Sequence, residues 1–264
     1  MSGEGGMLEP DVTITDYILT AQCFWFAVLI YKKSINLPWL LFFGSLSIAS
    51  LAGGTTHGFF SDETLVSYVI LWRAALIAIG AVALAGWYVG AAFIRNKQVA
   101  WWIKKFAIVQ FSLFALIILF YSQQFLLAAI NYLPAAFFLF FVFIRSYLKT
   151  NERAPLYGAL GIILTFIGSF IQIAKISLHP QYFNHNALYH AIQFVAICLL
   201  FVTARWDIMR GNMKNNNITR RDVIGCTAKV TGAFLALPYL STRGSIANAA
   251  TSPITAFLMF SPLR

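Results

Sequence analysis

Three of the four histidines in this chain are placed where they could hold a metal ion. His57 ends one long apolar stretch, and His185 and His190 begin another. Three imidazoles leave the fourth position of a tetrahedral zinc ion open for water, which is the arrangement of catalytic zinc sites. Zinc lowers the pKa of that water to about 7 and polarises a carbonyl group. His57, His185 and His190 therefore predict a zinc site.

Further polar residues could complete such a site. Asp62 follows His57 closely, and either Asp62 or Asp16 could act as a general base or orient an imidazole. Polar groups in hydrocarbon are costly unless they face a wet cavity or the interior of a bundle, so they indicate a functional site. Four such side chains are candidates for substrate or oxyanion contacts: Arg73, Gln172, Lys175 and Gln193.

The composition is that of an integral membrane protein. Of 264 residues, 59% are hydrophobic and 11% are charged, whereas a soluble domain has about 25% charged residues. The net charge of +10 resides mainly in short loops, which indicates topology signals and anionic-lipid contacts and not a nucleic-acid partner. The three cysteines are scattered, so neither a disulfide framework nor a thiolate metal site is predicted.

Seven apolar stretches reach the length of about 20 residues that a membrane-crossing helix needs. We therefore predict an all-α polytopic membrane protein with seven transmembrane helices in residues 15–212. Residues 1–14 would be an external segment and 213–264 a tail outside the fold. The predicted spans are 15–31, 38–59, 65–94, 106–122, 125–147, 156–178 and 186–204.

The basic residues predict the orientation of the helices. Lys and Arg gather in the loops after the first, third and fifth spans and in the tail after the seventh. The opposite side contributes only Lys175, with Arg73 inside a span. The positive-inside rule then places the N-terminus outside and the C-terminus in the cytoplasm. All four histidines fall at the non-cytoplasmic ends of the spans.

Polar residues also recur at helical spacing. Thr165, Gly168, Gln172, Lys175 and His179 would share one face of the sixth span. Similar stripes in the first, second and seventh spans could converge on an outward-facing pocket. Helix packing alone is the alternative, since small residues let membrane helices approach and amides bond between them.

The two histidine segments resemble motifs of a known superfamily. His57 with Asp62, and the segment from His185 to His190, are similar to the alkaline ceramidase and progestin-and-adipoQ-receptor superfamily of seven-helix membrane hydrolases. The resemblance implies zinc on three histidines and hydrolysis of lipid-like amides or esters. The partners would then be membrane lipid and an amphipathic small molecule.

The chain departs from that superfamily at two points. Gly53 stands where the superfamily has a catalytic serine, and Ser50 lies one turn earlier as the candidate for that role. Four residues separate His185 from His190, where the superfamily has three. Five positions turn a regular helix about 140° beyond a full turn, so both rings face one metal only if the first turn unwinds.

Other interpretations use the same residues. The histidines could cap helices or hydrogen-bond in a non-catalytic sensor or binding protein, or ligate a haem in an electron carrier. Residues 219–249 resemble a twin-arginine export signal, with Arg220, Arg221 and an Ala-Asn-Ala segment. This would be a fused or read-through segment, and it indicates a bacterial inner membrane with the pocket on the periplasmic side.

Overall fold

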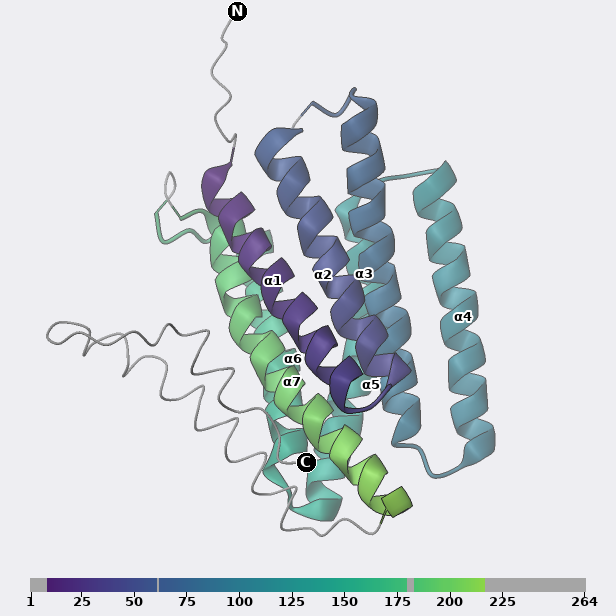
Figure 1. Ribbon diagram of the computed structural model, residues 1–264. Coiled ribbons are helices and arrows are strands. Elements are labelled where there is room, and N and C mark those ends of the chain that lie inside the picture. The colour runs from purple at the N-terminus through teal and green to yellow at the C-terminus, as the bar shows by residue number, and fades with distance from the viewer. Residues whose placement is uncertain (1–8, 61, 180–182, 217–264) are drawn as a thin grey trace, which may run out of the picture.

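The computed structural model describes residues 9–60, 62–179 and 183–216, and within these residues the chain forms seven helices (Figure 1). Each helix is long and apolar enough to cross a membrane. The chain is therefore an integral all-α membrane protein, as predicted. The helices are α1 (Pro10–Lys33), α2 (Leu37–Phe59), α3 (Val66–Ala92), α4 (Lys97–Phe120), α5 (Phe125–Thr150), α6 (Arg153–Ile173) and α7 (His185–Asn216).

Side-chain caps set several helix starts. Asn36 accepts a hydrogen bond from the Trp39 backbone N–H at the start of α2. Asn96 accepts from the backbone N–H groups of Gln98 and Val99 at the start of α4. These bonds satisfy backbone donors that have no partner inside the helix.

Four helix ends differ from the predicted spans by five residues or more. α4 begins at Lys97 and not at 106, about two and a half turns earlier. Within this added part Lys104 and Lys105 lie over the rings of Tyr88 and Trp101, which places their charges on aromatic faces. α6 ends at Ile173 and not at 178. α1 begins at Pro10, within the predicted external segment, and α7 extends to Asn216. The twin-arginine-like segment lies outside the described residues.

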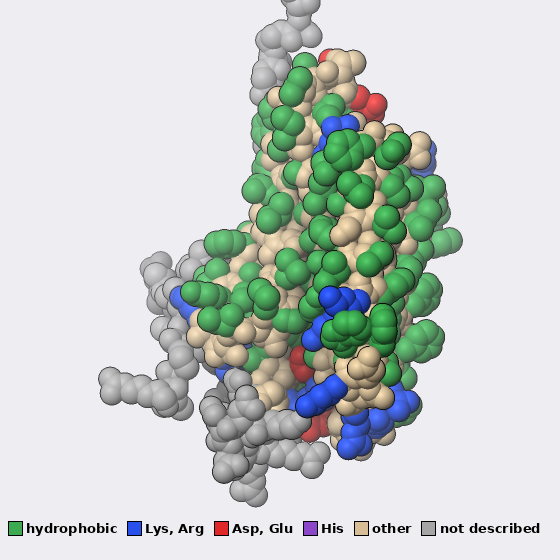
Figure 2. All heavy atoms as spheres, turned by 90° about the vertical axis from the view of Figure 1, so that its right-hand side faces the viewer, with side chains coloured by type: hydrophobic (Ala, Val, Ile, Leu, Met, Phe, Trp, Pro, Cys, Tyr) green, Lys and Arg blue, Asp and Glu red, His purple; other side chains and the backbone are tan. Residues whose placement is uncertain are grey.

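Six helices form a closed ring, and α4 lies outside it. Neighbours pack in the order α1, α2, α3, α5, α6 and α7, and α7 returns to α1. α4 packs mainly on α3 and is the least buried helix (Figure 1). Viewed from the α4 side, the surface is mostly apolar at mid-height, with Lys and Arg gathered toward the lower end (Figure 2). This is the surface that a lipid-facing helix requires.

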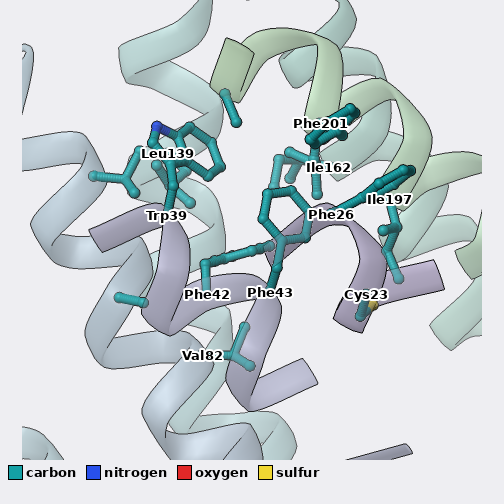
Figure 3. Close-up of a cluster of buried hydrophobic side chains, with 14 of the residues drawn as sticks. Cys23, Phe26, Trp39, Phe42, Phe43, Val82, Leu139, Ile162, Ile197 and Phe201 are labelled. Carbon is teal, nitrogen blue, oxygen red and sulfur yellow. The ribbon is translucent and has the colours of Figure 1, made fainter. Parts of the chain in front are cut away.

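An aromatic core fills the half of the bundle that contains the end of α1 and the start of α2 (Figure 3). Phe26 stacks on Phe201 with ring centroids 3.9 Å apart and meets Phe43 edge-on at 5.7 Å. The opposite end holds the starts of α1, α3, α5 and α7, and we call it the N-terminal end. All four histidines lie at or near this end.

Candidate functional site

A buried carboxylate and a buried imidazole meet between α1 and α7. The Asp16 Oδ1 atom lies 3.4 Å from His190 Nε2, and the two side chains are only 7% and 11% exposed. Asp16 is about 9 Å along α1 from its first residue, well inside the membrane-crossing segment. The contact joins the first helix of the ring to the last.

The second ring nitrogen of His190 is also engaged. His190 Nδ1 lies 3.1 Å from Thr15 Oγ1, while the Thr15 hydroxyl lies 2.9 Å from the carbonyl oxygens of Asp11 and Val12. If the Thr15 hydroxyl donates to one of these carbonyl oxygens, its own oxygen accepts a hydrogen bond from the protonated Nδ1 of His190. The contact between Nε2 and Asp16 is then one of two kinds. Either a protonated imidazolium faces the Asp16 carboxylate, or a neutral imidazole faces a protonated Asp16 carboxyl group. Both forms carry no net charge, as a site inside a membrane requires.

A glycine lets α2 pass close to this pair. A Cβ added at Gly54 would lie 2.7 Å from the Cβ of Asp16, which is closer than packing allows. A Cβ at Gly53 would lie 3.6 Å from Asp16 Oδ2, an ordinary contact. Gly54 is therefore required for the approach of α1 and α2 beside Asp16.

His57 pairs with a different carboxylate of α1. Its Nδ1 atom lies 3.0 Å from Glu9 Oε2, and the two side chains are 30% and 47% exposed. The imidazole also meets the Trp72 ring of α3 edge-on, with centroids 6.2 Å apart. His57 thus connects the start of α1 to α3 at the exposed rim of the N-terminal end.

The start of α7 is held by polar contacts that do not use His185. Asn184 accepts hydrogen bonds from the backbone N–H groups of Asn186 and Ala187, and its own N–H donates to Asp11 Oδ2 at 3.0 Å. His185 is the first residue of α7 and is half-buried. The first turn of α7 is helical, without the unwinding that a shared metal ion would require.

The predicted zinc ligands are not gathered into one set. His57 and His190 each face a carboxylate on α1, and His185 lies a helical turn and a half before His190. Among residues 9–60, 62–179 and 183–216, no three His, Cys, Asp or Glu side chains are grouped so that they could share a metal ion. The described geometry therefore does not fit the zinc prediction.

The predicted catalytic partners lie apart from the imidazoles. Asp62 is fully exposed, and hydrogen bonds from the hydroxyl and backbone N–H of Thr64 hold the pKa of its carboxyl below the usual range. Ser50 is half-buried on α2, two turns before His57. Asp16, and not Asp62, is the carboxylate that contacts a histidine inside the bundle.

The four predicted substrate contacts occupy different surroundings. The Gln172 amide donates to Asn186 Oδ1 at 3.1 Å and joins α6 to α7. Lys175 lies beyond the end of α6 with a left-handed backbone, so the predicted stripe from Thr165 to His179 is interrupted after Gln172. Arg73 Nε and Gln193 Oε1 are buried, and neither has a hydrogen-bond partner among the described residues.

The contributions of Glu9, Asp11 and Thr15 were missed from the sequence. Glu9 directly precedes α1, and Asp11 and Thr15 lie in its first two turns. The sequence suggested an external segment for Glu9 and Asp11, and Thr15 begins the predicted first span. The available signal was the seven-residue spacing of Glu9 and Asp16, which places two acids near one face of a helix.

The chain belongs to a family of unknown function, DUF6962, which it matches over residues 12–207. The matched region contains Asp16, His57 and His190 and ends within α7. No curated protein and no solved structure matches the chain. The resemblance to the alkaline ceramidase superfamily stays a prediction.

Proposed function

We propose that this member of the DUF6962 family is a sensor or binding protein of the membrane whose responsive element is the Asp16–His190 contact. The observation that carries the proposal is the burial of these two side chains against each other within membrane-crossing segments. Ionisable groups at such positions are expensive and are typically functional. Both ring nitrogens are engaged, which favours a contact between helices over a free imidazole for catalysis.

α7 offers a route from this contact to the other end of the bundle. It is 32 residues long, or about 48 Å. Near its far end Asp207 accepts hydrogen bonds from the Trp39 indole at 3.1 Å and from Arg210 at 3.0 Å, while Trp206 donates to Glu152 at 2.8 Å. A change of proton or ligand state at His190 would shift α7 and alter these contacts. Such a shift requires that the two arrangements differ in their affinity for the proton or ligand.

The charge pattern supports a direction for this signal. Lys and Arg are concentrated at the end that contains Asp207, so this end would face the cytoplasm. The twin-arginine-like tail supports a bacterial inner membrane, with the N-terminal end facing the periplasm. The protein would then respond to conditions or ligands outside the cell.

Hydrogen–deuterium exchange on the full chain in lipid nanodiscs tests the proposal. The variant Asp16→Asn removes the ionisable partner of His190 with little change of volume. We expect faster exchange in two separate segments, residues 10–20 and residues 203–211 at the far end of α7. The control Tyr17→Phe removes a 3.2 Å hydrogen bond to Thr55 at similar depth, but between α1 and α2. It should leave residues 203–211 unchanged.

Two results would contradict this proposal. If Asp16→Asn changes hydrogen–deuterium exchange only at the N-terminal end, the pair is a local structural contact and not a responsive element. Hydrolysis of a lipid amide or ester by the wild type, lost in His57→Ala, would favour the hydrolase instead.

A further inference from the structure

A cavity at the N-terminal end lies apart from the Asp16–His190 contact. It has a volume of about 370 Å³ and is open to solvent, and this volume is within the range of small-molecule sites. The walls come from the loop after α2, the first two turns of α3 and the connection between α4 and α5. The lining residues are Glu63, Tyr68, Trp72, Gln123 and Gln124.

Two aromatic rings form one wall of this cavity. Tyr68 and Trp72 are one turn apart on α3 and lie nearly parallel, with centroids 6.2 Å apart and an angle of 23°. The Trp72 indole N–H donates to the Gln123 carbonyl oxygen at 2.9 Å. The only ring N–H of the wall is thus already engaged, and what the rings still offer is their electron-rich faces.

The polar groups of the cavity include two acceptors, the Glu63 carboxylate and Gln123 Oε1. Glu63 is exposed, and its carboxylate lies close to the Tyr68 hydroxyl. Gln123 Oε1 is buried and has no hydrogen-bond partner within the described part of the chain. Among the described lining residues none is Lys, Arg or His. An acceptor left without a donor in a buried position costs free energy, and a ligand with N–H groups would remove that cost.

The one charged side chain among the described lining residues is negative. α3 and α5 both begin beside the cavity, and each contributes about half a positive charge at its N-terminus. The Glu63 carboxylate, which lines the cavity, carries a full negative charge that balances these partial charges. Arg73 follows Trp72 on α3 but is not part of the lining.

We propose that this cavity binds a small organic ammonium ion, with its cationic group between the Glu63 carboxylate and Gln123 Oε1 and its apolar body against Tyr68 and Trp72. Aromatic faces together with a carboxylate are the usual surroundings of bound organic cations. The site does not use Asp16 or His190, so binding can be measured whether or not that pair drives a conformational change.

Ligand-observed NMR on the full chain in uncharged nanodiscs tests this inference, with butylammonium as the probe. We expect saturable binding of butylammonium and none of the neutral 1-butanol or the anion butyrate. Glu63→Gln should weaken binding roughly tenfold. Tyr68→Leu should weaken it about threefold, whereas Tyr68→Phe, which keeps the ring, should retain near wild-type affinity.

Asp62→Asn is the matched control, because it removes the same charge from the adjacent residue of the same loop, outside the lining. It should bind butylammonium as the wild type does. Three results would overturn the inference: no saturable binding, equal binding of 1-butanol, or equal weakening in Asp62→Asn and Glu63→Gln.

Discussion

Glu9 and Asp16 lie two helical turns apart at the start of α1, and each pairs with an imidazole from a different neighbouring helix. Glu9 contacts His57 of α2 at 3.0 Å, and Asp16 contacts His190 of α7 at 3.4 Å. α1 is therefore the element that brings the two histidines into one layer. The outer pair is half-exposed and should contribute little to stability, whereas the inner pair is buried.

We expect the inner pair to be energetically coupled. His190→Leu leaves Asp16 buried without its partner and should destabilise the protein by about 3 kcal/mol. The double variant with Asp16→Leu should lose at least about 1 kcal/mol less than the sum of the two single variants. The measurement is the free energy of unfolding in detergent. His185→Leu is the control and should change it by less than about 0.5 kcal/mol. Additive single effects would contradict the coupling.

Gly54 should not tolerate a methyl group. Its added Cβ would lie 2.7 Å from Asp16 Cβ, so Gly54→Ala must separate α1 from α2 and should destabilise the protein by about 1–3 kcal/mol. Gly44 is a matched control on the same helix, since a Cβ there meets nothing within 4 Å. Gly44→Ala should stabilise the protein by about 0.5–1 kcal/mol through the better helix propensity of alanine. Thermal unfolding of both variants provides the comparison, and equal midpoints would contradict it.

The seven helices could be predicted because hydropathy is local. A run of about 20 apolar residues identifies a membrane-crossing helix wherever its neighbours lie. Helix ends were less predictable, because they depend on side-chain contacts. α4 gains about two and a half turns at its start, in which Lys104 and Lys105 contact aromatic rings. α6 stops before Lys175, whose backbone is left-handed.

The layer of histidines was also predictable, but their partners were not. The spans alone place His57 and His190 at one end of the bundle. The pairing of His190 with Asp16 depends on α7 closing the ring against α1, which joins residues 174 positions apart. Hydropathy does not specify the order of helices in a ring, so Asp62, close to His57 in sequence, seemed the better partner.

The orientation of the bundle can be measured by cysteine labelling. The positive-inside pattern predicts that Asp62 faces the outside of the cell and Asn151 the cytoplasm. Asp62→Cys should therefore react with a membrane-impermeant maleimide in intact cells, and Asn151→Cys should react only after the membrane is broken. Both positions lie outside the helices, and the native Cys23 and Cys198 are buried. The third native cysteine, Cys226, is replaced by serine in both variants so that it cannot react. The reverse labelling pattern would mean that the N-terminal end of the bundle faces the cytoplasm. The proposed signal would then run in the opposite direction across the membrane.

The zinc content of the chain distinguishes between its two candidate functions, the membrane binding protein proposed above and the zinc hydrolase that the resemblance implies. Because His57 and His190 each face a carboxylate and no three-residue ligand set is formed in the described residues, we expect far less than one zinc ion per chain after dialysis. Mass spectrometry of the detergent-purified chain provides the measurement, with His57→Ala and His190→Ala alongside. The variants should not change the zinc content. About one zinc ion per chain, lost in both variants, would mean that the imidazoles leave Glu9 and Asp16 to bind metal. That result would favour the hydrolase and justify assays on lipid amides and esters.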